Sequence, residues 1–314
     1  MSMYIMKRIL MIVPIFLIAT FVTYGMISLS PVDPAEAYFA AAHIQATDQM
    51  IEDKRAELGL DQHFVVQYLE SLKRISQFDF GLSYLTDKPV FQEITSRMSA
   101  TIQLSISSLL IAIVVSVPIG FFAGMKKNSL IDHLSRALSF IGASIPSFWL
   151  GYLLIFFLSV KFDLFPVEGT GSWQHLVLPS LTLAFPLIAV YTRLLRTSVM
   201  DNLKEPYVLF ARTRGLREKL IIGKHLFRMS ISPMIAGLGM NLGNLMTGAI
   251  IVEVVFSWPG FGRYFIDALF NRDIPVIQGY VVLASAIFLL ANLLVDLLQM
   301  MIDPRIARVR GGSK

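Results

Sequence analysis

Six stretches of this 314-residue sequence contain no Asp, Glu, Lys or Arg, and they restrict the fold more than any other feature. Each exceeds about 20 residues, the length that an α-helix needs to cross a bilayer. Charged residues make up 16% of the chain, against about a quarter in soluble domains. The sequence therefore predicts an all-α polytopic membrane protein with six transmembrane helices. The stretches cover residues 9–32, 98–125, 137–160, 169–192 (with the span itself expected near 176–197), 229–252 and 274–295.

The basic residues predict the orientation of these helices. If the N-terminus lies in the cytoplasm, the inner segments collect 18 of the 27 Lys and Arg residues and only five carboxylates. The outer segment 31–97 then carries 11 carboxylates and six basic residues. Loops rich in Lys and Arg stay on the cytoplasmic side. Both termini are therefore expected in the cytoplasm, and the net charge of +5 indicates topology rather than a nucleic-acid partner.

The spacing of the spans predicts the organisation of the chain. Residues 1–32 form a retained first span, since this apolar run is longer than the core of a secretory signal. An extracytoplasmic segment follows at 33–94, with helical periodicity at 48–58 and 62–75 and Asp61 as the expected N-cap of the second helix. The remaining five spans occupy 95–302, and 303–314 form a cytoplasmic tail. The outer segment is either a small helical cap or a docking surface for an external partner.

The long inner loop at 199–228 is the most informative segment. Pro206 suits the first turn of a short helix, and Gly215 suits its end. Such a helix could enter a groove of another protein or bind the membrane surface. The residues expected to carry the contact are Glu205, Tyr207, Phe210, Ala211, Arg212, Arg214, Gly215 and Leu216, with Tyr207, Phe210, Ala211 and Arg214 on one face.

Enzymatic chemistry finds no support in the sequence. Cysteine is absent, and the five histidines lack metal-ligand spacing, so neither a metal site nor a cofactor is expected. Residues 215–225 lack the internal glycine of a phosphate loop, and His225 stands where Ser or Thr should follow Lys224. The chain is therefore not expected to hydrolyse ATP by itself.

Polar residues near the fifth span are candidates for a translocation pathway. Asn241 and Asn244 recur with glycines at helical spacing, and this pattern fits either helix packing or a polar pathway. Glu253 lies about 36 Å along that span at 1.5 Å per residue, and Asp296 lies equally far along the sixth. Neither carboxylate is at the midplane, where a secondary transporter places its coupling groups.

The loop and several other motifs resemble one transporter family. Ala211-x-x-x-Gly215 with Pro233 downstream is similar to the cytoplasmic EAA loop of permease subunits of ATP-binding-cassette importers. The resemblance covers almost the whole chain and is to the B-type subunit of the dipeptide, oligopeptide and nickel branch, although Leu209 and Phe210 replace the Glu and first Ala of the loop. The supporting motifs are Leu58-Gly59-Leu60-Asp61, Asp79-Phe80-Gly81-x-Ser83, Ser144-Ile145-Pro146-Ser147-Phe148-Trp149, Trp258-Pro259-Gly260-x-Gly262 and Asp273-Ile274-Pro275-Val276-Ile277-Gln278.

The resemblance implies a type I importer permease in the bacterial inner membrane. Its implied partners are a second homologous permease, two ATPase subunits that dock on the cytoplasmic loops, and an extracytoplasmic solute-binding protein. ATP-driven closure of the ATPases would move the helix at 211–215 and switch the bundle between inward-facing and outward-facing states.

The solute is predicted from weaker resemblances. Trp173-Gln174-His175, Phe270-Asn271-Arg272-Asp273 and Asp303-Pro304-Arg305-Ile306 are similar to nickel-importer subunits, so nickel ion or a metal chelate is the expected solute. A dipeptide or oligopeptide is the alternative. A non-transporting membrane scaffold is an alternative from another functional class.

Overall fold

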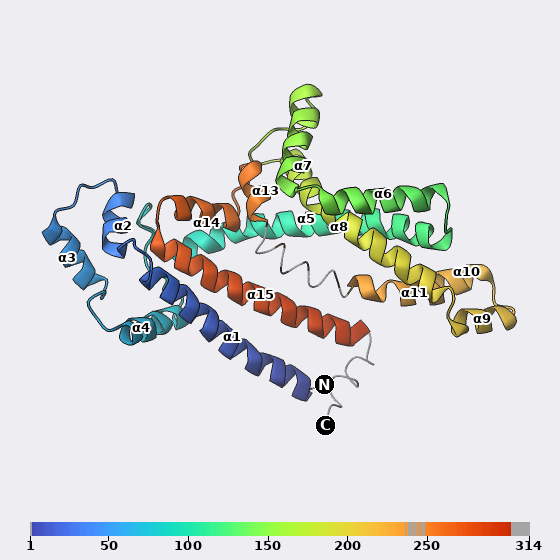
Figure 1. The fold of residues 1–314 in the computed structure, drawn as a ribbon, viewed down its shortest axis with the longest axis horizontal. Helices are drawn as coiled ribbons and strands as arrows, with labels where there is room; N and C mark the ends of the chain where they lie inside the picture. Colours follow the sequence, from blue (N-terminus) through green and yellow to red (C-terminus); the bar gives the residue numbers. More distant parts are fainter. Residues whose placement is uncertain are drawn as a thin grey trace. The chain divides into compact units, whose positions relative to one another are not determined.

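The computed structural model describes residues 2–235, 237, 241, 243, 245 and 249–302. Within these residues the chain is helix and loop, apart from one isolated bridge between Leu82 and Pro89. The expected all-α architecture is therefore confirmed (Figure 1).

The helices fall into an N-terminal and a C-terminal group in chain order. The first group is α1 (Ser2–Ser28), α2 (Pro34–Ala41), α3 (Asp48–Glu57), α4 (Phe64–Ser76), α5 (Val90–Met125), α6 (Leu130–Ser144), α7 (Ser147–Leu154) and the π-helix η1 (Ile155–Lys161). The second is α8 (Trp173–Asn202), α9 (Pro206–Thr213), α10 (Glu218–Leu220), the π-helix η2 (Ile221–Leu226), α11 (Phe227–Ser230), α13 (Ile250–Val255), α14 (Phe261–Phe270) and α15 (Ile274–Ile302).

Four helices of the described residues are long and apolar enough to cross a membrane. They are Leu10–Ser28, Val90–Met125, Trp173–Asn202 and Ile274–Leu294, and they correspond to the first, second, fourth and sixth predicted spans. A bent pair, Leu130–Ser144 with Ser147–Lys161, makes a fifth. The middle of the span predicted at 229–252 lies outside the described residues.

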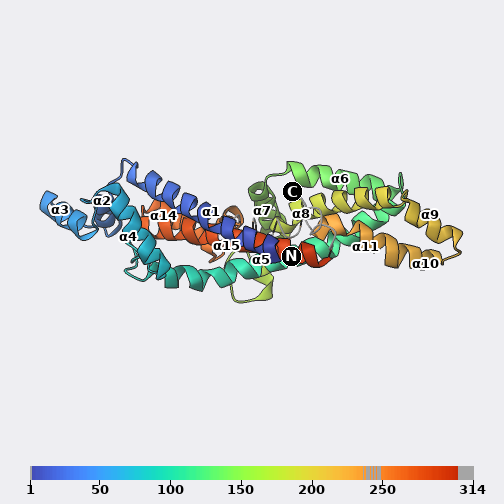
Figure 2. The same ribbon diagram turned by 90° about the horizontal axis from the view of Figure 1, so that it is seen from below.

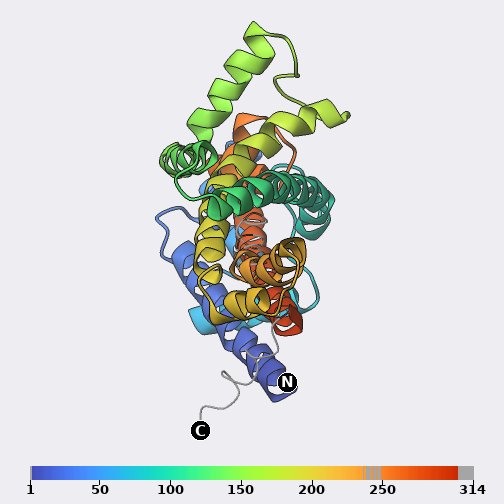
Figure 3. The same cartoon turned by 90° about the vertical axis from the view of Figure 1, so that its right-hand side faces the viewer.

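The third predicted span is not one straight helix. Its two halves, α6 and α7 with η1, meet at 107° (Figure 3). Ile145 has ψ of 124°, which is extended backbone, and Pro146 begins the next helix as its N-cap. Proline disfavours the α conformation of the residue before it and lacks the N–H that would continue the ladder. The span predicted over 137–160 therefore contains a sharp bend, which the uncharged run alone did not predict.

The chain divides into two compact units. One contains residues 102–258 and the described part of 290–314, and the other contains 2–101 and 259–289. We call these the coupling unit and the outer unit, after the sequence-predicted roles of the segments 199–228 and 33–94. Each is described by itself.

In the coupling unit, glycines allow helices to approach α8 closely. A Cβ added to Gly142 of α6 would lie 2.5 Å from Ala189 Cβ, and one added to Gly124 of α5 would lie 2.7 Å from Val199 Cβ. Real Cβ atoms do not come this close, so no larger residue fits at either glycine. Helices α6 and α8 lie side by side as a result (Figure 2). Small residues perform this role in lipid, where hydrophobicity does not drive helices together.

Gly142→Leu is expected to destabilise the coupling unit, because its side chain must push α6 away from Ala189. Overpacking of this kind costs about 1–3 kcal/mol, which lowers Tm by roughly 2–4 °C for each kcal/mol. Thermal unfolding of the purified protein in detergent measures the effect. Gly25→Leu is the matched control in a helix, since nothing lies within 4 Å of the Cβ added there. Equal Tm values for the two variants would contradict the close packing.

In the outer unit, α4 packs against the end of α1. The Tyr24 hydroxyl donates to Gln67 Oε1 at 2.8 Å, and the Phe21 and Phe64 rings meet edge to face at 5.7 Å. The helices predicted at 48–58 and 62–75 are confirmed as α3 and α4. The expected cap was wrong, however: His63, not Asp61, caps α4, and its Nδ1 accepts the Val65 N–H at 3.4 Å.

Buried polar contacts hold α14 and α15 to the N-terminal part of the outer unit. Tyr264 of α14 donates its hydroxyl to Glu93 Oε2 at 2.5 Å, and Arg97 lies over the Tyr264 ring at 4.0 Å. The Ser83 hydroxyl donates to Asp273 Oδ2 at 2.5 Å, directly before α15. Burial raises the pKa of Asp273 above the ordinary carboxyl value. The two hydrogen bonds join residues that are 171 and 190 positions apart in the sequence.

Candidate functional site: the coupling helix

The predicted loop helix is α9, and its N-terminus forms as the sequence indicates. Glu205 is the N-cap, with extended backbone, and Pro206 occupies the first helical position. Proline is favoured there because its φ suits the helix and its missing N–H has no intrahelical partner to lose. Helix α9 then runs to Thr213, which places Phe210, Ala211 and Arg212 within it.

Gly215 ends α9 in a Schellman motif. Its φ is +71°, in the left-handed region that non-glycine residues rarely adopt. Its N–H donates to Arg212 O at 2.9 Å, and the Leu216 N–H donates to Ala211 O at 3.2 Å. These two bonds satisfy carbonyls that the end of a helix leaves open. The chain therefore leaves α9 at one defined angle.

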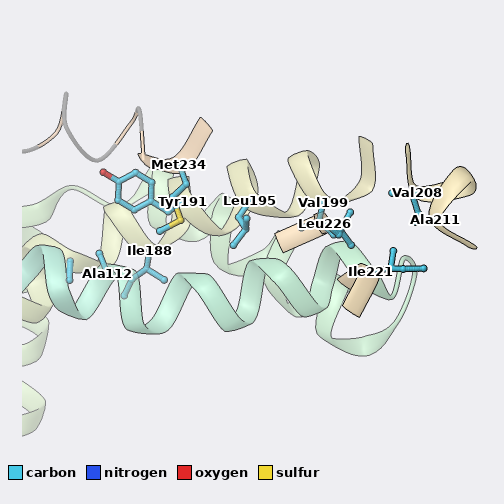
Figure 4. Close-up of a cluster of buried hydrophobic side chains, with 11 residues drawn as sticks. Ala112, Ile188, Tyr191, Leu195, Val199, Val208, Ala211, Ile221, Leu226 and Met234 are labelled. Atoms are coloured by element: carbon cyan, nitrogen blue, oxygen red, sulfur yellow. The ribbon is translucent and has the colours of Figure 1, made fainter. Parts of the chain in front are cut away.

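One side of α9 is anchored in the core of the coupling unit. Val208 is 1% exposed and Ala211 9%, and both belong to a hydrophobic cluster that also contains Val199, Ile221 and Leu226 (Figure 4). That cluster continues along α8 to residues 184–195 and to Ala112 of α5. Side chains of α9, α8 and η2 are packed in one core. A displacement of α9 would therefore be transmitted to α8 through these contacts.

Tyr207 adds a polar anchor at the same side of α9. Its hydroxyl donates to Asn202 Oδ1 at 2.9 Å, which ties α9 to the end of α8. Burial and the nearby carboxylate of Glu205 both raise the pKa of Tyr207. The hydroxyl thus keeps its proton and remains a donor.

The opposite side of α9 presents apolar side chains to the surroundings. Leu209 and Phe210 are 66% and 68% exposed, and in the segment after α9 Leu216 and Leu220 are 39% and 43% exposed. The sequence pattern placed Phe210 and Ala211 on one face of the helix. In the structure Ala211 is buried and Phe210 is exposed, so the two residues do not share a face. Val208 shares the buried face with Ala211. It lies three residues before Ala211, and this helical spacing could have predicted the shared face from the sequence.

The charged residues of the loop lie at its surface. Arg212 donates through Nε to Glu218 Oε1 at 2.8 Å, and both side chains are about half exposed. Arg214 follows the last turn of α9 and is exposed. The two arginines form the basic edge of an exposed apolar patch that contains Leu209, Phe210 and Leu216. We call this patch, Leu209, Phe210, Arg212, Arg214 and Leu216, the coupling surface.

A buried ion pair close to the loop escaped the sequence analysis. Asp132 of α6 has a fully buried side chain and accepts hydrogen bonds from Arg196 Nε of α8 and from the Asn128 N–H, the latter at 2.8 Å. Arg136 lies farther away, at 4.0 Å, and is half exposed. The sequence does contain a signal for this ion pair. Asp132 is a single carboxylate among the basic residues between the second and third hydrophobic stretches.

The candidate pathway residues are only partly described. Asn241 donates through Nδ2 to the Tyr191 hydroxyl at 2.8 Å and to Gly237 O at 3.1 Å. Asn244 lies outside the described residues. Glu253 is fully buried in α13, a helix that packs against α7 and α8. Glu253 thus lies in the interior of the coupling unit, and Asn241 is half-buried beside Tyr191.

Acidic and histidine side chains do not assemble into a metal site within the described part of the chain. In that part no three of His, Cys, Asp or Glu lie close enough together to hold an ion.

Comparison with known proteins gives consistent matches along the chain. The profile of the binding-protein-dependent transport system inner membrane component family matches residues 116–308, and a profile of the N-terminal part of such membrane components matches 1–105. The glutathione transport system permease protein GsiC of Escherichia coli (strain K12) is 39% identical over 303 residues, 96% of this chain and 98% of that protein. The GsiC protein of Salmonella typhimurium (strain LT2) matches with the same figures.

Two solved structures share the helical fold. The MetNI methionine ABC transporter in its inward-facing conformation matches with a TM-score of 0.54 and 17% identity, over 67% of this chain and 96% of that chain. An amino acid ABC transporter crystallised with histidines matches with a TM-score of 0.51 and 16% identity, over 68% and 94%.

Proposed function

This chain belongs to the family of binding-protein-dependent transport system inner membrane components, and we propose that it carries short peptides across the membrane. It is a pore-forming, multi-pass inner-membrane permease of an ATP-binding-cassette importer, and its relatives are transport proteins rather than enzymes. An ATPase and a solute-binding protein are the partners that this family implies. A non-transporting scaffold has no counterpart among the relatives described above.

The peptide proposal rests on the relatives at 39% identity. Their name assigns them glutathione, which is a tripeptide, and the match covers 96% of this chain. It supports the peptide alternative better than nickel or a metal chelate, the solutes first expected from shorter motifs. In such importers the binding protein also selects the solute, so the chain need not hold a metal site or a tight peptide site.

The proposed coupling mechanism uses the coupling surface. The exposed Leu209 and Phe210 seat in an ATPase subunit, and Arg212 and Arg214 meet acidic groups at its edge. Val208 and Ala211 then transmit the movement to α8 through the shared core. The single observation that carries this proposal is that α9 is buried on one side and apolar on the other. A second, homologous permease and a second ATPase complete the assembly, and both termini face the cytoplasm.

Uptake by cells with and without this chain tests the proposed solute. We expect uptake of radiolabelled glutathione or alanyl-alanine to depend on the chain and to resist excess nickel. The chain-dependent uptake should be competed by unlabelled short peptides. Chain-dependent nickel uptake that ignores excess dipeptide would overturn the peptide proposal and restore the metal interpretation.

A further inference from the structure

The outer unit contains a cavity of about 980 Å³ that the coupling mechanism does not use. This volume lies at the upper end of the range for small-molecule sites, about 300–1,000 Å³. The cavity is partly open, and it is lined by the end of α1, the start of α2, the end of α3, one side of α4, the turn at 79–89 and the start of α15. All of its lining residues belong to the outer unit.

One face of α4 forms a polar wall of this cavity. Gln67, Glu70, Ser71 and Arg74 are spaced by three or four residues, so they share a face of the helix, and all four line the cavity. Gln67 is fixed by its bonds to Tyr24, Leu60 O and Gln62 O, and Ser71 by a 2.9 Å bond from Gln278. The wall is therefore held in place before any ligand arrives.

The charged side chains of the lining are of both signs. Three cations and five carboxylates face the cavity: Lys54, Arg55, Arg74, Asp33, Glu57, Glu70, Asp79 and Asp87. The lining thus has a net negative charge, so its carboxylates favour a ligand that brings a positive group.

The arginines of the lining can accept a new partner at low cost. Arg55 contacts Asp33 at 3.3 Å and Arg74 contacts Asp79 at 2.9 Å, in each case through Nε. The Arg74 and Asp79 side chains are both more than half exposed, and exposed ion pairs are worth about 0–1 kcal/mol. A guanidinium also has N–H donors other than Nε, which can bind a carboxylate while the existing pair persists.

We propose that this cavity is a low-affinity entry site for the free amino and carboxylate ends of a short peptide. Glu70 receives the ammonium group, and Arg74 of α4, with Arg55 of α3, receives the carboxylate. The assignment rests on the proposed peptide function and extends it to a site on the permease itself.

The spacing along α4 matches the length of a dipeptide. Glu70 and Arg74 are four residues apart, which is about 6 Å along the helix axis. An extended dipeptide spans at most about 7 Å from end to end. Longer peptides of the same charge can extend toward Arg55, since the cavity is larger than a dipeptide requires.

Direct binding to the assembled importer in nanodiscs, without its solute-binding protein, tests the site. Ligand-observed NMR with alanyl-alanine should show saturable binding, and N-acetyl-alanyl-alanine, which lacks the ammonium group, should not compete. Glu70→Gln should weaken the binding about tenfold, because it removes a charge-assisted hydrogen bond. Glu52→Gln is the matched control, since Glu52 is an exposed carboxylate of α3 outside the lining.

Uptake of alanyl-alanine by the same complexes, with the binding protein added, separates the two proposals. Uptake by the unsubstituted importer, with binding that is absent or equal in the Glu70→Gln and Glu52→Gln variants, would overturn the entry site and leave the peptide function intact. Binding that Glu70→Gln weakens, without any uptake, would overturn the peptide function and keep the site. A raised KM at unchanged maximal rate for Glu70→Gln supports both.

Discussion

Gly215→Trp is expected to abolish transport while the protein still inserts into the membrane. The substituted residue must hold a φ of +71°, which costs about 1 kcal/mol for a non-glycine residue, and this penalty alone does not unfold the chain. Nothing lies within 4 Å of the added Cβ, so the structure itself has room for a side chain. The indole instead projects beside Leu216 at the edge of the coupling surface, where we propose that the ATPase docks. Uptake should fall at least tenfold, with stimulation of ATP hydrolysis lost in parallel.

Two control variants separate backbone strain from blocked docking. Gly215→Asn should keep most of the uptake, since asparagine tolerates the left-handed region and has a short side chain. Gly223→Trp places the same indole elsewhere in the loop, at a position that also has nothing within 4 Å of the added Cβ, and it should retain transport. Normal uptake by Gly215→Trp, or equal losses in all three variants, would contradict docking at this surface.

Asp132→Ala is expected to destabilise the coupling unit strongly. It leaves Arg196, whose side chain is 16% exposed, without its carboxylate, and it removes the acceptor of the Asn128 N–H. Breaking a buried ion pair by removing one partner costs about 3–5 kcal/mol, because the remaining charge stays desolvated. Thermal unfolding in detergent should show a Tm lower by roughly 6–20 °C at about 2–4 °C for each kcal/mol.

Arg136→Gln provides the comparison for this prediction. Arg136 lies 4.0 Å from the same carboxylate and is half exposed, so its loss should cost less than about 1 kcal/mol. Asp132→Asn should fall between the two, since the amide oxygen can still accept a hydrogen bond but carries no charge. Similar Tm values for Asp132→Ala and Arg136→Gln would show that the pair contributes little to stability.

The sequence predicted the parts of the fold that depend on local patterns. Long uncharged runs predicted the apolar helices, and Pro206 with Gly215 predicted both ends of α9, because the capping requirements act within a few residues. The bend after Ile145 also has a local cause, which is Pro146. It was not predicted, because the span was assigned from the length of the uncharged run alone.

Tertiary contacts decided what local patterns could not. Helical spacing places Phe210 and Ala211 near one face of α9. In the structure, α8 and η2 pack against the side that carries Val208 and Ala211, and Phe210 stays exposed. The pairing of Asp132 with Arg196 joins residues 64 positions apart, so no short window of sequence contains it. The cavity of the outer unit likewise needs α15 beside α4, a proximity that periodicity does not encode.

The close contacts that glycines of α5 and α6 make with α8 hold part of this helix rigid. The close contacts of Gly120, Gly124 and Gly142 meet α8 between Phe185 and Val199, so we expect this part of the helix to move as one piece if α9 moves. Pro179 and Pro186 lie in the first half of α8, where each removes a backbone hydrogen bond and eases bending. If α9 moves as we propose, the movement enters α8 at Asn202 and passes along this packed part, and we expect any bending of the helix at the two prolines. The positions of the two prolines would then limit how far a movement of α9 is transmitted along α8.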